Sequence, residues 1–301
     1  MNARNGGPVT PHDGAGAREA ELLLPALEEA VGWVRDLLCA GRGSPVDVRR
    51  VLAVGNGSDA VTRLLARTFP HAVTHGRADA EANGQANGRA GTEARFSGRD
   101  GAFEGLGTAE LVWASGVVDR RDDQQAAVDA LAASLRPGGV LAVVERGLPL
   151  RFLPRDIGIG RPGLQARLDA AAEERSASRR AEPPGSAATV EDRPAMLARA
   201  GLVPSGTRTF LTDLRAPLGL AARRHLHAHL VRLLDQVGGL LRADDRAALE
   251  RLADEDEPAG ILWRPDAFYL TATTVHTGRA CSGTPRTAGG RASLWEVRKR
   301  P

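Results

Sequence analysis

A glycine turn between a predicted strand and a predicted helix is the first feature that could do chemistry. Residues 51–61 read VLAVGNGSDAV, in which an apolar run stops at Gly55-Asn56-Gly57 and a helical pattern follows. Glycines let a ligand approach the backbone, and the first turn of a helix offers unpaired N–H groups. Asp59 falls at the start of this helix, where the helix dipole favours a negative charge. The pattern therefore predicts a site for a nucleotide-like ligand.

Glu145 is the candidate for a catalytic side chain. It ends a predicted strand, VLAVVE at 140–145, and open α/β sheets bind ligands at the carboxyl ends of their strands. A role at a helix start or at the edge of the core is the alternative for this residue. The sequence contains no G-x-S-x-G motif, no P-loop and no paired carboxylates.

The segment HLHAHL at 225–230 raises the question of a metal site, because His225 and His229 are one helical turn apart. His229, however, falls within the apolar stripe of the same helix, and no third ligand is evident. We therefore expect these histidines to pack at the core or its rim, and we predict no metal. His276 ends the last predicted strand, where a structural role is expected.

Apolar strands and helices alternate through the first half of the chain. The predicted strands are 50–54, 72–74, 110–115 and 140–145, and the predicted helices are 25–40, 58–68 and 122–135, the last one ended by RPGG at 136–139. Such alternation indicates right-handed crossovers over a parallel sheet. We predict an α/β protein with a doubly wound, mainly parallel seven-stranded sheet whose last strand is antiparallel.

The second half predicts a helical insertion before the last strand. Helices are expected at 163–180, 194–202 and twice within 219–254, and strands at 207–214 and 267–275. The insertion would span 215–262. The segment 151–163 follows a strand directly, so we expect it to border the mouth of the pocket, with the insertion helices covering it.

Composition limits the function classes. The net charge is +3, but residues 279–301 carry a net of +5, so the rest of the chain carries −2. The basic charge therefore belongs to a Gly/Ser/Thr/Pro-rich tail, and we expect no nucleic-acid partner. Cys39 and Cys281 have no metal or disulfide spacing. The chain shows no membrane span and no leader segment, which favours a cytoplasmic protein.

With these elements in place, the order from Val51 to Glu145 resembles a class I S-adenosylmethionine-dependent methyltransferase, with the actinobacterial members most similar. The most specific match is ELVWAS at 110–115, followed by a helix that starts with acids and then by LRPGGVLAVVE at 135–145. The resemblance covers residues 45–150 well and 190–278 loosely. It implies a Rossmann-like methyltransferase domain at 19–278, between a disordered N-terminus (1–18) and the disordered basic tail (279–301).

The resemblance also implies which residues hold S-adenosylmethionine. Gly55 and Gly57 match the glycine turn, and Asp79 is the candidate for the acid that bonds the ribose, displaced by one residue. Asp100, with the adjacent Gly101, matches the acid on the adenine side. Ser115 ends the fourth strand of the family pattern, beside the sulfonium.

The sequence departs from the family pattern on the cofactor side. Ala53 stands where an acid is usual, and Asp59 replaces the last glycine. We expect methyl transfer to a small or medium organic acceptor, with weakened cofactor binding, and the chain could form a homodimer. One alternative is an inactive methyltransferase-like partner or regulatory protein. Another is an NAD-binding oxidoreductase, since Gly55, Gly57 and Ala60 also fit G-x-G-x-x-A.

Overall fold

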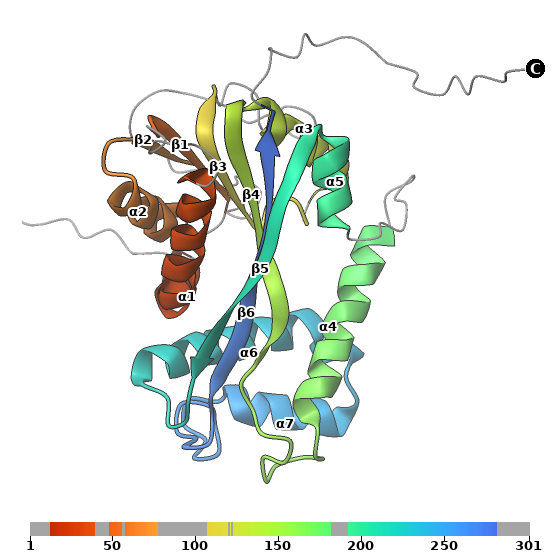
Figure 1. Ribbon diagram of the computed structural model, residues 1–301. Helices are drawn as coiled ribbons and strands as arrows, with labels where there is room; N and C mark the ends of the chain where they lie inside the picture. The colour runs from red at the N-terminus through yellow and green to blue at the C-terminus, as the bar shows by residue number, and fades with distance from the viewer. Residues whose placement is uncertain are drawn as a thin grey trace, which may run out of the picture.

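The computed structural model describes most of the chain. The described residues are 13–39, 48–55, 58–77, 107–119, 121, 123–181 and 192–281. Among them is one mixed sheet of six strands with helices on both faces (Figure 1). This architecture confirms the predicted fold class. The described sheet has six strands rather than seven, and the segment 78–106 lies outside the described residues.

The last strand of the chain lies inside the sheet and runs against its neighbours. The strands are β1 (Arg50–Gly55), β2 (Val73–Arg77), β3 (Ala109–Ser115), β4 (Leu135–Arg151), β5 (Leu202–Leu214) and β6 (Tyr269–Ala280), in the order β2-β1-β3-β4-β6-β5. The first four are parallel to their neighbours within that group. β6 is antiparallel to both β4 and β5. The predicted antiparallel last strand is therefore confirmed.

Helices bury both faces of the parallel part of the sheet. One face packs against α1 (Asp13–Cys39) and α2 (Ser58–Thr68), and the other against α3 (Gln124–Ala133) and α5 (Arg193–Arg199). Burial on both faces explains why β1, β3 and the middle of β4 are almost continuously apolar. The carboxylates of Asp123 and Asp192 cap α3 and α5, each accepting an N–H of the first turn, at 2.8 and 3.1 Å.

Three strands continue beyond the carboxyl ends of β1 and β3. The pairing of β4 with β3 ends at Val144, and the rest of β4 pairs with β6 alone. The lower parts of β4, β5 and β6 run down among α4 (Leu164–Ala181), α6 (Leu220–Val237) and α7 (Ala243–Ala253) (Figure 1). Their apolar side chains and those of the loop 152–163 form a second core. The predicted helical insertion thus packs around the far end of the strands.

Several elements are longer than predicted. α1 begins at Asp13, within the segment expected to be disordered, because Ala20 is buried and Glu19 binds Arg146 of β4 at 2.8 Å. β6 continues to Ala280, just into the predicted tail. None of the helices in the described ranges is both long and apolar enough to span a bilayer.

The RPGG segment belongs to β4 and does not merely end the preceding helix, which stops at Ala133. A β-carbon at Gly139 would lie 2.9 Å from the carbonyl oxygens of Arg136 and Glu110. Glycine is therefore needed there for β4 to approach β3 closely. The same approach coincides with a register shift between Ala109 and Leu111.

Candidate functional site

The carboxyl edge of the parallel strands brings together two residues that the sequence predicts to be cofactor ligands. Gly55 at the end of β1 pairs with Ser115 at the end of β3, and Ser115 pairs with Val144 of β4. The amide of Gly116 donates to the carbonyl of Val144 at 2.9 Å, which closes the ladder. Ser115 and Gly116 are half-buried, so small residues form this edge.

Backbone packing alone requires the glycine at position 55. Its φ is +120°, and a β-carbon would lie 2.0 Å from the Ser115 carbonyl oxygen and 2.9 Å from Cγ1 of Val117. A contact of 2.0 Å is far inside van der Waals distance, so any side chain would force β1 and β3 apart. Glycine at this position is therefore explained without a ligand.

The other predicted cofactor ligands are not placed by the structure. Gly57, Asp79, Asp100 and Gly101 lie outside the described residues. Asp59 lies in the first turn of α2, as predicted, but its side chain is not among those described. Their assignments stay predictions.

The predicted catalytic residue, Glu145, is bound to an arginine that the sequence gave no reason to select. The Arg193 guanidinium donates from Nε to Oε1 of Glu145 and from Nη1 to Oε1 of Gln124 at 2.7 Å. The exposed fraction of the Arg193 side chain is 2%, and that of Glu145 is 15%. A catalytic role for Glu145 stays a prediction, and the structure shows in addition that it neutralises a buried cation.

His276 lies on the same face of the sheet as Glu145. Its Nε2 is 3.9 Å from Oε2 of Glu145, and its Nδ1 is 3.1 Å from the hydroxyl of Thr207 on β5. Burial lowers the pKa of His276 below its ordinary value, and the positive charge of Arg193 lowers it further. The imidazole is therefore neutral near pH 7 and can accept a proton or a hydrogen bond.

Threonine hydroxyls continue this polar face away from the edge. Glu145 pairs with Thr274 of β6, which pairs with Thr209 of β5, and opposite residues of antiparallel strands share a face. The hydroxyls of Thr209 and Thr274 are 2.9 Å apart. Glycine at position 147 lets β4 pack closely against Thr274, because a β-carbon there would lie 2.2 Å from Oγ1 of that threonine.

The histidines of α6 pack against aromatic rings. The rings of His229 and Phe152 are 5.7 Å apart, and those of His225 and Tyr269 are 5.8 Å apart. Burial and the nearby charge of Arg232 lower the pKa of His229 to about 4. No group of three potential metal ligands occurs in the described part of the chain. The packing role predicted for His229 agrees with this geometry.

The segment 151–163 is not at the carboxyl edge, contrary to the prediction. β4 continues seven residues past Val144 to Arg151. Because of two register shifts, this part of β4 spans only the five residues from Val275 to Leu270 of β6, or about 17 Å. The segment therefore packs in the second core against the insertion helices, at the far end of the strands. The prediction failed because it took β4 to end at Glu145.

Comparisons with known proteins find similar solved structures only. No protein-family model matches the chain, and no curated protein matches it. A provisionally named sarcosine dimethylglycine methyltransferase from Galdieria sulphuraria is 14% identical, with 85% of each chain covered and a TM-score of 0.40.

Two further solved structures are also described as methyltransferases. A provisionally named type II methyltransferase from Anaeromyxobacter dehalogenans is 16% identical, with 85% of this chain and 97% of that chain covered and a TM-score of 0.43. An O-methyltransferase family protein from Burkholderia thailandensis is 14% identical, with 91% and 60% covered and a TM-score of 0.41. By description, all three are methyltransferases. Because the TM-scores are below 0.5, we base the function on the geometry of the chain itself.

Proposed function

We propose that the protein transfers a methyl group from S-adenosylmethionine to a small or medium organic acceptor. The observation that carries the proposal is the carboxyl edge, where β1 ends at Gly55 beside Ser115 and α2 begins three residues later. This edge belongs to a sheet whose last strand is inserted antiparallel between β4 and β5.

The described residues at the edge fit such a cofactor. Gly55, Ser115 and Gly116 place nothing larger than a hydroxymethyl group there, so no side chain of these three fills the space beyond the strand ends. Ser115 and the turn after β1 would hold the methionine part, and Asp79 and Asp100 the ribose and adenine. When bound, the cofactor supplies an electrophilic methyl group, and the protein mainly has to align the acceptor with it.

Glu145 and His276 are the groups that would receive a proton from the acceptor. Both are 15% exposed on the polar face next to the edge, and the lowered pKa of His276 keeps its imidazole neutral near pH 7. Arg193 fixes Oε1 of Glu145, which leaves Oε2 on the side of His276. The hydroxyls of Thr207, Thr209 and Thr274 would hold a polar acceptor beside these groups.

An inactive, methyltransferase-like partner protein is the second candidate function. The specific observation in its favour is Gly55, since packing against Ser115 would preserve this glycine even without a cofactor. The pairing of Glu145 with buried Arg193 also gives that carboxylate a structural reason to exist. An oxidoreductase that binds NAD is the third candidate, because it would use the same glycine turn.

Calorimetric titration separates the three candidates. We expect S-adenosylhomocysteine to bind in the micromolar range and NADH not to bind. Ser115→Leu should weaken that binding by filling the edge, as should Gly57→Val and Asp100→Ala. Ser178→Leu on the exposed side of α4 is the control that should leave it unchanged. Absence of heat with both ligands at millimolar concentration would support the partner protein, and binding of NADH alone the oxidoreductase.

Asp59→Gly then tests the departure from the family pattern. Tighter binding of S-adenosylhomocysteine would mean that the Asp59 carboxylate repels the carboxylate of the cofactor. Weaker binding would mean that it holds the ammonium group.

A further inference from the structure

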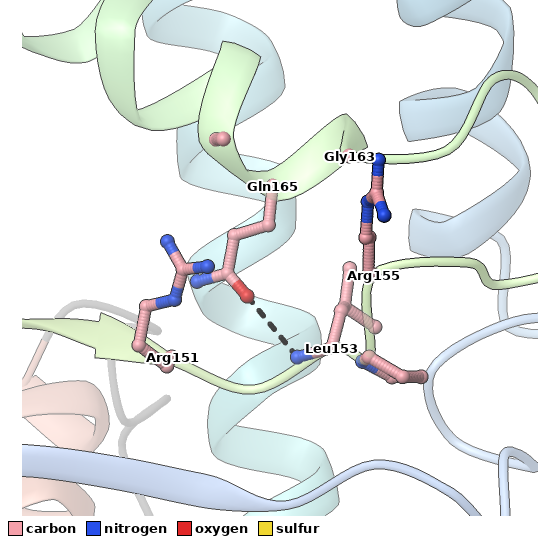
Figure 2. A pocket seen from close by; sticks show the side chains of 7 residues that line it. Arg151, Leu153, Arg155, Gly163 and Gln165 are labelled. Atoms are coloured by element: carbon pink, nitrogen blue, oxygen red, sulfur yellow. Dashed lines mark hydrogen bonds between the residues drawn. The ribbon is translucent and has the colours of Figure 1, made fainter.

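We propose that a cavity at the far end of β4 binds a small carboxylate that has an apolar body. The cavity has a volume of about 320 Å³, at the lower end of the ~300–1,000 Å³ typical of ligand pockets. It lies between the end of β4 and the start of α4 (Figure 2). Its lining consists of Arg151, Leu153, Pro154, Arg155, Gly163, Gln165 and Ala166.

The amide of Gln165 is already used by the protein. Its oxygen accepts from the amides of Phe152 and Leu153, both at 3.1 Å, and its nitrogen donates to the carbonyl of Leu150 at 2.5 Å. These bonds fix the chain where it leaves β4, as Figure 2 shows for the bond to Leu153. Gln165 therefore forms a rigid wall and has little hydrogen-bonding capacity left for a ligand.

The remaining polar groups of the lining side chains are two guanidinium groups. Arg151 is oriented by an ion pair with Asp169 of α4, at 3.1 Å. The side chain of Arg155 is exposed and has no hydrogen bond or ion pair with any residue that the structure describes. Figure 2 shows the Arg155 side chain extending past Gly163, across the cavity from Arg151. One of the two positive charges at the cavity is thus uncompensated.

This combination selects the class of ligand. A guanidinium group donates paired hydrogen bonds to a carboxylate, and charged partners make the stronger bonds. A neutral polar molecule would find no side-chain acceptor here. Leu153, Pro154 and Ala166 offer apolar contact to the rest of the ligand. Inorganic phosphate has no apolar part that could make this contact. A carboxylate attached to a ring or a short hydrocarbon satisfies both parts of the cavity.

The site is separate from the proposed cofactor edge. Arg151 lies about 17 Å along the sheet from Val144, since their partners Leu270 and Val275 are five residues apart on β6, and the second core surrounds this end of the strands. The proposal therefore does not depend on methyl transfer, and its test uses no S-adenosylmethionine.

Binding of benzoate to the full chain tests the proposal, with benzamide as its neutral counterpart and inorganic phosphate as an anion without an apolar body. Amide chemical shifts and calorimetry should report saturable binding of one benzoate at millimolar concentration, with a shift of the amide of Gly163, which lines the cavity. Arg155→Gln should weaken binding about tenfold, and Arg155→Lys less than Arg155→Gln, because lysine keeps the charge. Arg246→Gln, an exposed arginine on α7, should bind as the unaltered protein does.

Three results would overturn the inference. The first is that Arg155→Gln and the unaltered protein bind benzoate with equal affinity. The second is that the unaltered protein binds benzoate and benzamide equally well. The third is that it binds phosphate more tightly than benzoate. Because Arg155 is exposed and unpaired in the described structure, its replacement leaves the fold intact. Coincident unfolding curves of the variants and the unaltered protein check this condition.

Discussion

Replacing Gly55 by alanine should separate what packing requires from what a ligand would require. The new β-carbon would lie 2.0 Å from the carbonyl oxygen of Ser115, and the backbone would keep a φ of +120°. Both effects act on the folded protein in the absence of any cofactor.

The cost has two parts. A positive φ costs an L-residue about 1–2 kcal/mol, and the shift needed to relieve overpacking costs about 1–3 kcal/mol more. We therefore expect Gly55→Ala to lower the free energy of unfolding by about 2–5 kcal/mol, a large part of the ~5–15 kcal/mol typical of a folded protein.

Two other glycines serve as matched controls. Gly158 has a φ of +70° but no atom within 4 Å of a built β-carbon, so Gly158→Ala carries only the backbone cost of about 1–2 kcal/mol. Gly239 has neither a positive φ nor a close neighbour, and alanine there should stabilise by about 0.4–1 kcal/mol.

Urea unfolding at constant pH, followed by circular dichroism, measures all three variants. If Gly55→Ala lowers the free energy of unfolding by no more than Gly158→Ala does, the ends of β1 and β3 move apart at little cost and the packing explanation is refuted. The glycine would then need a functional explanation, and loss of S-adenosylhomocysteine binding in a stable Gly55→Ala protein would provide it.

Two further predictions concern buried titratable groups. Arg193→Met leaves the Glu145 carboxylate without its buried partner, so it should cost about 3–5 kcal/mol in urea unfolding. The double variant with Glu145→Gln should cost less than the sum of the two single variants, and strict additivity would show that the pair is not coupled. The pKa of His229 is lowered to about 4 in the folded protein, against about 6.5 in the unfolded chain. The free energy of unfolding therefore keeps its full value above pH 6.5 and decreases by about 3 kcal/mol as the pH falls to 4. His229→Phe keeps the ring contact with Phe152 and should make the free energy of unfolding nearly independent of pH between pH 4 and 6.5. The exposed residue His71 provides the control variant, His71→Phe. A pH dependence unchanged from that of the parent protein, or one reduced equally by His71→Phe, would contradict the prediction.

The elements of the parallel sheet could be predicted from the sequence because burial on both faces leaves an unbroken apolar signal. β1, β3 and the middle of β4 were located to within about two residues for this reason. The antiparallel direction of the last strand was predicted from the order of the elements, two strands separated by a pair of helices, whereas its position between β4 and β5 was not predicted.

The length of β4 could not be predicted, because its lower part changes environment. From Glu145 onward every residue of the strand except Leu150 is half-buried or exposed, and Gly147 and Pro149 are residues that usually break strands. This part is held by pairing with β6, between residues that are 119 to 129 positions apart in the sequence. The misplaced segment 151–163 follows from that one error.

The buried ion pair of Arg193 could not be predicted for a different reason. Nearly every basic residue of this chain is arginine, so residue type alone does not distinguish a buried guanidinium from a solvated one. The three partners of its side chain come from α3, β4 and its own helix, and only the folded chain brings them together.

The continuity of β4, β5 and β6 through both cores has a consequence for how the molecule comes apart. In the part of the chain that the structure describes, the second core and the core of the parallel sheet share the same three strands. Unfolding of one core removes strands from the other core, so we expect both to unfold in one cooperative transition. For the same reason α6 and α7, which connect β5 to β6, could be replaced in evolution by other helices. The second core as a whole could not be transferred to another protein as an independent domain, because its strands belong to the main sheet.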